Sequence, residues 1–131
     1  MDFRTSAKNI TLNVNDEGGV VVLPVSDEGW IKRFTDYLKM IEEKSKERTE
    51  RAAGDNEKSI EETYGLAMDC KSGFNALFGE GAYEAVYGTE LVGVEYIIEF
   101  IEYCVPFIEE RMEKRNTMLK KYDASRMGGA G

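Results

Sequence analysis

The feature that most constrains the fold of this chain is a long helical pattern near its C-terminus, from about Glu90 to Tyr122. Apolar residues recur there every three or four positions, which is the repeat of an α-helix with a buried face. One stripe consists of Leu91, Val94, Ile97 or Ile98, Ile101, Val105, Ile108 and Met112. A second stripe beside it consists of Tyr96, Phe100, Tyr103 and Phe107. A helix that is apolar on two sides must be central in its fold or form part of an interface.

Pro106 lies inside this pattern. Proline lacks the amide hydrogen and clashes with the preceding turn, so we expect a kink near Pro106. After Tyr122 the apolar repeat stops, and the chain ends in Gly-Gly-Ala-Gly. This composition predicts a flexible Gly-rich tail over residues 123–131.

The first 25 residues have a different pattern. Apolar and polar residues alternate over Ile10–Val14, and a β-branched run, Val20–Leu23, follows a turn cluster at Asn15–Gly19. These signals predict an N-terminal β-hairpin segment over residues 1–25. A lone hairpin is marginally stable in water, so it must pack on helices or on another subunit.

Two further helices and a short one are predicted between the hairpin and the long pattern. Ser26 is the expected N-cap of the first helix, which ends near Ala53 in a charged, solvated stretch. Asp55 or Asn56 caps the second helix, and Gly79 and Gly81 end it. Its predicted apolar face consists of Ile60, Tyr64, Ala67, Cys70 or Lys71, Phe74, Leu77 and Phe78.

The short helix covers residues 82–87, and Thr89 is the expected N-cap of the last helix. The predicted fold class is therefore mainly α: three principal helices, a short helix and an N-terminal β-hairpin. At 131 residues the chain suits a single helical domain over residues 26–122, flanked by the hairpin segment and the tail.

The residue types needed for common catalytic chemistry are sparse. The chain has no histidine, which removes the commonest general base and the commonest zinc ligand. Its two cysteines, Cys70 and Cys104, lie far apart in apolar helical patterns, so we expect reduced, buried thiols. We therefore predict no catalytic residue, no metal site and no cofactor, and a protein that is not an enzyme.

Charge and hydropathy limit the partners. Residues 111–126 carry net +4, whereas the remainder carries −12 against a total of −8. An acidic chain is repelled by nucleic acid, and no apolar run reaches the ~18 residues of a membrane span. We expect neither a nucleic-acid nor a membrane partner, and an intracellular protein, because the start of the chain has no secretion signal pattern. The basic segment either contacts an acidic partner or complements the helix dipole.

The segment Phe74–Gly88 contains a turn, Leu-Phe-Gly-Glu-Gly, followed by a short helix that ends in Tyr-Gly. Together with the surrounding residues, roughly 60–110, it resembles small acidic tail assembly chaperones of long-tailed bacteriophages and prophages of Gram-positive bacteria. Ala82 departs from the small hydroxyl residue often found at its position. The resemblance implies a non-enzymatic role in the cytoplasm of the bacterial host. Such a chaperone coats the aggregation-prone tape measure protein until the major tail protein displaces it.

Coating a helical client requires exposed apolar helix faces. The candidate partner-binding residues are the aromatic residues of the turn region and of the second stripe: Phe78, Tyr83, Tyr87, Tyr96, Phe100, Tyr103 and Phe107. Ordinary core packing is the alternative for each of them. Besides the tape measure protein, the major tail protein and a second copy of the chain, as a homo-oligomer, are candidate partners.

Two other functions fit a small acidic phage protein. An acidic decoy would block a host nucleic-acid-binding protein, and a structural tail component would remain in the virion. Clustered carboxylates on one face would favour the decoy, but acidic residues here alternate with Lys and Arg. A structural component would be found in finished particles, whereas a chaperone would be absent.

Overall fold

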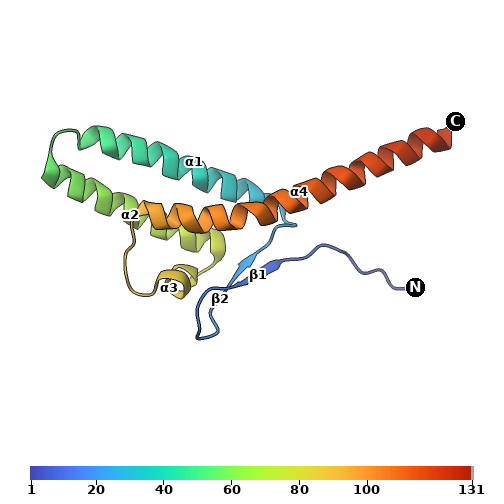
Figure 1. The fold of residues 1–131 in the computed structure, drawn as a ribbon, viewed down its shortest axis with the longest axis horizontal. Coiled ribbons are helices and arrows are strands. Elements are labelled where there is room, and N and C mark those ends of the chain that lie inside the picture. The colour runs from blue at the N-terminus through green and yellow to red at the C-terminus, as the bar shows by residue number, and fades with distance from the viewer. Residues whose placement is uncertain (131) are drawn as a thin grey trace.

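The computed structural model describes residues 1–130, with side chains through Arg126. It confirms a mainly helical chain with an N-terminal hairpin (Figure 1). The elements in chain order are β1 (Ile10–Asn13), β2 (Val20–Leu23), α1 (Glu28–Arg51), α2 (Asn56–Phe78), α3 (Ala82–Tyr87) and α4 (Val94–Ala130). The helices α1 and α2 form an antiparallel pair, and α4 packs against α2 and then projects beyond the other elements.

The antiparallel hairpin pairs Leu12 with Val21 and Ile10 with Leu23. One of its faces is buried, because Leu12, Val21 and Leu23 point into the core. The opposite face exposes Val20 and Val22. The hairpin therefore packs on the helices of its own chain, in the manner that its marginal intrinsic stability requires.

The N-cap of α1 is Asp27, and the prediction of Ser26 was wrong. The Asp27 carboxylate accepts hydrogen bonds from the amides of Gly29 and Trp30, at 2.8 and 3.2 Å. The Ser26 hydroxyl instead accepts from the amide of Lys8 and donates to its carbonyl, both at 3.1 Å. The hairpin brings Lys8 beside Ser26, a long-range contact that leaves the next polar residue to cap the helix.

The helices α1 and α2 pack closely because Gly73 of α2, which has no side chain, lies against α1. A Cβ atom at Gly73 would overlap the ring of Tyr37. The Tyr37 hydroxyl donates a 2.6 Å hydrogen bond to the carbonyl of Cys70, on the same stretch of α2. The predicted cap of α2 at Asp55 is confirmed, since its carboxylate accepts from the amides of Glu57 and Lys58.

Aromatic side chains make up the centre of the core. Phe74 is fully buried, and its ring centroid lies 4.6 to 5.8 Å from those of four other rings: Phe78, Tyr83, Tyr87 and Phe100. The indole of Trp30 is also buried and donates a 2.8 Å hydrogen bond to the Leu77 carbonyl. These contacts join α1, α2, α3 and α4 around one cluster.

The predicted apolar face of α2 holds only in its second half. Ile60 and Tyr64 are 72% and 60% exposed, although their spacing places them on the face of Phe74. The reason is that α2 is longer than the core: its first turns extend past α3 and α4, and only α1 lies beside them (Figure 1).

The reversal between α2 and α3 depends on Gly79 and Gly81, which have φ values of 111° and 83°. Side chains at such positive φ values are strained, so glycine suits both positions. The turn folds α3 back onto α2 and buries Tyr83.

The last helix begins at Val94, not near Glu90, and Thr89 is not its cap. The amide of Val92 donates a 2.9 Å hydrogen bond to the hydroxyl of Tyr83. This bond holds the segment after Gly88 in a non-helical conformation across α3. The helix α4 therefore begins at Val94, after this segment.

The helix α4 contains Pro106 and changes direction along its length (Figure 1). It continues through Ala130, past the end expected at Tyr122. The segment predicted as a flexible tail is thus helical over residues 123–130, and Gly131 lies outside the described residues. Residues 113–126, which we call the arm, expose every side chain. Strong helix formers such as Lys, Leu, Met and Arg support the helix up to Tyr122. Residues 123–130 include Asp123, Ser125 and two glycines, so helix propensity does not account for the extension past Tyr122.

Candidate interaction groove

A groove of about 560 Å³ lies between β1, α3 and the first half of α4. The strand and the residue after it contribute Leu12, Asn13 and Val14. The helices contribute Val86, Tyr87, Tyr96, Glu99, Phe100, Glu102 and Tyr103. The lining therefore combines apolar side chains with two carboxylates and has no basic residue.

Hydrogen bonds fix the walls of the groove relative to one another. The Tyr87 hydroxyl donates a 2.7 Å bond to the carbonyl of Tyr96, which ties α3 to the first turn of α4. The side-chain amide of Asn15 donates a 3.0 Å bond to the carbonyl of Ala85, which ties the hairpin turn to α3. Burial raises the pKa of Tyr87 well above its ordinary value, so its hydroxyl remains a donor. The groove is thus preformed.

The base and the edge of the groove differ in exposure. Phe100 lies at the base, half-buried, with its ring centroid 5.2 Å from those of Phe74 and Phe78. Tyr96 and Tyr103 at the edge are 51% and 60% exposed. Exposed aromatic rings next to carboxylates suit an apolar surface that also carries Lys or Arg.

Four of the seven predicted partner-binding residues meet in this groove: Tyr87, Tyr96, Phe100 and Tyr103. Phe107 lies next to it, with its ring centroid 5.9 Å from that of Tyr103.

Phe78 and Tyr83 do not form part of an exposed surface. They are 8% and 1% exposed and belong to the core cluster. The turn at Gly79 and Gly81 explains the burial of Tyr83, because it folds α3 back so that the ring of Tyr83 packs on Phe74. Phe78 lies at the end of α2, and its ring packs against Trp30 and Phe100. Core packing, the alternative for both residues, is what the structure shows.

Sequence reasoning missed the carboxylates and the strand side of the groove. Glu99 lies three residues after Tyr96 and four before Tyr103, so helical spacing alone places it on their face. Leu12 and Val14 gave no such signal, because more than 70 residues separate them from Tyr87. Only the tertiary packing of the hairpin brings them to the groove.

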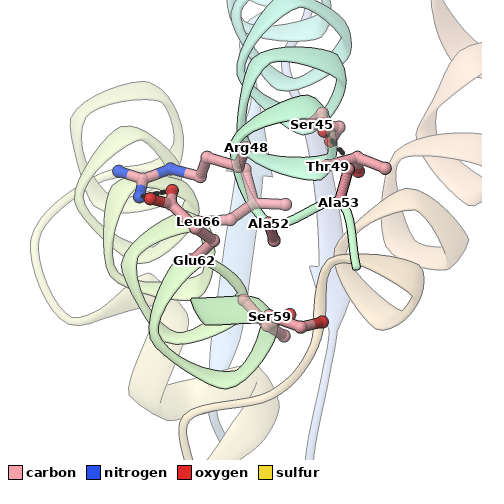
Figure 2. A pocket seen from close by; sticks show the side chains of 9 residues that line it. Ser45, Arg48, Thr49, Ala52, Ala53, Ser59, Glu62 and Leu66 are labelled. Carbon is pink, nitrogen blue, oxygen red and sulfur yellow. Dashed lines mark hydrogen bonds and ion pairs between the residues drawn. The ribbon is translucent and has the colours of Figure 1, made fainter. Parts of the chain in front are cut away.

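A second pocket, of about 260 Å³, lies between the end of α1 and the start of α2 (Figure 2). Arg48 lines it, and its guanidinium pairs with Glu62 at 2.9 Å and with Asp69 at 2.8 Å. The hydrogen bond from Arg48 holds the pKa of Asp69 below its ordinary value. The charges at this pocket are thus paired within the chain, and their role is to join α1 to α2. The charged end of α1 was predicted to be solvated, but part of it forms ion pairs with α2.

Both cysteines are free and buried, as predicted. Burial raises the pKa of Cys70 to about 11 and that of Cys104 to about 12, so both thiols are protonated at neutral pH. Within residues 1–130, no group of three or more His, Cys, Asp or Glu side chains is arranged to hold a metal ion. No helix of this described part is both long and apolar enough to span a bilayer.

The sequence matches a family model over residues 18–129, described as a family of unknown function, DUF6673. The chain belongs to the DUF6673 family. No curated protein and no solved structure matches it. The DUF6673 match begins after β1 and contains β2, α1, α2, α3 and all of α4 except its last residue, Ala130. The helical side of the groove therefore lies inside the DUF6673 region, whereas the strand side precedes it.

Proposed function

We propose that the protein is a non-enzymatic tail assembly chaperone that binds the tape measure protein of a long-tailed bacteriophage or prophage in the cytoplasm of its bacterial host. The observation that carries this proposal is the preformed groove with exposed tyrosine rings and an acidic edge. The resemblance over residues 60–110 suggests the class of client. The groove suggests where that client binds.

A helical segment of the client is the form of ligand that fits. An amphipathic helix binds a groove by inserting apolar residues spaced three and four apart. The volume of about 560 Å³ lies within the usual range of binding sites for such side chains, about 300–1,000 Å³. The carboxylates of Glu99 and Glu102 favour client segments with Lys or Arg beside the apolar anchors.

The mechanism is stoichiometric binding without turnover. Each copy covers one apolar stretch of the tape measure protein and so prevents its aggregation. The net charge of −8 keeps the coated complex dispersed by mutual repulsion. The major tail protein displaces the chaperone when the tail tube assembles around the same client.

The test is co-expression with the tape measure protein encoded in the same tail gene cluster, followed by affinity capture and sizing. The variant Tyr96→Ala/Tyr103→Ala removes two exposed rings from the groove. The control Tyr64→Ala removes a ring that is equally exposed, at 60%, on α2. Phe100 is unsuitable for this test because its ring packs against Phe74 in the core.

We expect the native chain and Tyr64→Ala to keep the tape measure protein soluble with several copies per client. The groove variant should lower the captured client about tenfold, since buried aromatic anchors often contribute more than ~1 kcal/mol each. The proposal fails if the client aggregates beside the native chain, or if the folded groove variant captures it equally well.

A structural tail component is the second candidate function, and the exposed Val20 and Val22 on the outer face of the hairpin favour it. An uncovered strand face of this kind can be buried by a neighbouring subunit. Mass spectrometry of purified particles separates the two functions. The chain should be absent from finished particles if it is a chaperone and present if it is structural.

A further inference from the structure

The arm exposes apolar side chains that the rest of the chain does not cover. Met118, Leu119 and Tyr122 are 68%, 47% and 58% exposed and lie within about one helical turn of one another. The arm is about 20 Å long at ~1.5 Å per residue. Isolated helices of this length are marginal in water unless a partner buries their apolar side. The arm thus presents a binding element without a bound partner.

The charges of α4 are separated along its length. Residues 94–110 include five glutamates and no basic residue, whereas residues 111–126 carry net +4. A helix dipole interacts with charges only in the first and last turns. Lys114, Arg115, Lys120 and Lys121 all lie more than two turns before Ala130. The dipole therefore does not account for their position.

The basic arm complements the groove on the acidic half of the same helix. Glu99 and Glu102 line the groove, and neither carboxylate forms an ion pair within the described residues. Lys120 and Lys121 of the arm also form no ion pair in this part of the chain. Apolar side chains accompany the charges on both surfaces. The arm and the groove are therefore opposite in charge and alike in exposing apolar side chains, as two surfaces that bind each other require.

We propose that the arm of one copy of this chain binds in the aromatic groove of a second copy. The arm projects away from β1, α3 and the first half of α4 (Figure 1), which supply the residues of the groove, so the contact forms between copies. Both surfaces lie on α4, at opposite ends. Two copies that cross their α4 helices antiparallel therefore place each arm beside the groove of the other. Such a two-fold arrangement closes on itself and produces a dimer.

The inference concerns the groove of the proposed function but needs no client. If that function also holds, the arm and the tape measure protein compete for the same groove, so a client must displace the arm. This regulatory consequence rests on the proposed function, whereas the dimer itself is measured on the purified chain alone. A failure of one is thus distinguishable from a failure of the other.

The first experiment is sedimentation of the purified full-length chain over a range of concentrations, at low and at high ionic strength. We expect a monomer–dimer equilibrium that high salt shifts toward the monomer, because exposed charges are screened. A chain that remains monomeric up to its solubility limit at low salt would overturn the proposal.

The second experiment is a charge exchange between two variants. Lys120→Glu/Lys121→Glu reverses the arm, and Glu99→Lys/Glu102→Lys reverses the groove. Each variant alone should raise the dimer dissociation constant about tenfold or more, because like charges then face each other. Mixing the two variants should restore association, since each arm then meets a groove of opposite charge.

Matched controls separate the specific contact from general charge effects. Lys39→Glu/Lys46→Glu changes the net charge of the chain equally but acts on exposed positions of α1. It should leave the dimer unchanged. Tyr122→Ala should weaken the dimer, whereas Tyr64→Ala, at a similarly exposed ring on α2, should not. If the arms paired with each other instead, Glu99→Lys/Glu102→Lys alone would leave the dimer unchanged, and that result would exclude the groove as the binding site.

Discussion

The two halves of α4 form one continuous helix, yet their surroundings differ. In the first half, Ile97, Ile101 and Cys104 are at most 3% exposed and belong to the core cluster. In the arm, every side chain is exposed. Burial stabilises the first half, whereas local propensity and ion pairs of neighbouring turns, such as Lys114–Glu110, are what support the second. A helical pattern in a sequence thus predicts that a helix forms, but it does not predict which of its residues other elements bury.

The largest expected difference between the two regions concerns side-chain truncation. Phe74→Ala should lower the free energy of unfolding by about 3–5 kcal/mol, because it leaves a cavity among four aromatic rings. The measurement is urea denaturation followed by far-ultraviolet circular dichroism. Met118→Ala, in the arm, should change the same quantity by less than about 0.5 kcal/mol. Equal effects at the two positions would show that the arm is packed in the monomer.

An added methyl group should also distinguish the packed region. Gly73→Ala places a Cβ atom against the ring of Tyr37, where the α1–α2 pair leaves no room. We expect a net loss of about 1–2 kcal/mol in unfolding free energy, because the usual cost of overpacking, about 1–3 kcal/mol, exceeds the gain of about 1 kcal/mol from the higher helix propensity of alanine. The neighbouring Ser72→Ala is the control, since Ser72 is exposed and alanine favours the helix. A neutral Gly73→Ala variant would mean that α1 and α2 are less closely packed than described.

The raised pKa values of the two buried thiols determine how the free energy of unfolding should change with pH in the alkaline range. In the folded chain the pKa of Cys70 is about 11 and that of Cys104 about 12, against about 8.5 for an unfolded cysteine. The folded state therefore retains protons that the unfolded state releases. Stability is fully present below about pH 8.5 and falls as the pH rises toward the folded values, on the order of 1 kcal/mol per pH unit for each thiol.

Urea denaturation between pH 7 and pH 10 measures this slope. Cys104→Ala should make the slope shallower, whatever its effect on stability at pH 7. A chain that ends at Met112 should retain the full slope, because both thiols lie outside the arm. An unchanged slope in Cys104→Ala would show that this thiol is not the source of the pH dependence.

The smallest expected effect is that of removing the arm from the monomer. A chain that ends at Met112 should differ from the full chain by less than about 0.5 kcal/mol in unfolding free energy at low protein concentration. Its helical circular dichroism signal should fall with the loss of the helical arm. At high concentration the full chain should gain stability over the shortened one, because dimer formation favours the folded state. A large loss at low concentration would contradict the exposed arm.

Local sequence patterns predicted most of the fold. The alternation over Ile10–Val14, the cap at Asp55 and the glycines after Phe78 each act on neighbouring residues, so one segment contains the necessary information. Local patterns failed where distant residues compete. Ser26 bonds Lys8 and leaves the capping role to Asp27, and Val92 bonds Tyr83 and delays α4.

The groove was predictable only on its helical side. Tyr96, Phe100 and Tyr103 share one face of α4 by their spacing, and the sequence shows that spacing directly. Whether an aromatic side chain is covered depends on tertiary packing, and for this reason Phe78 and Tyr83 are core residues while Tyr64 is exposed. The strand side of the groove required the position of the hairpin, which no local pattern contains.

The buried, hydrogen-bonded indole of Trp30 gives the chain a built-in optical reporter. Trp30 is the only tryptophan, and its emission reports whether the start of α1 is docked on the end of α2. Its fluorescence should shift to longer wavelength when the core opens and water reaches the ring. Events confined to the arm leave this signal unchanged, whereas the tyrosines of the groove and of the arm respond to them. Tryptophan emission therefore follows folding, and tyrosine emission, which lies at shorter wavelength, follows assembly in the same sample.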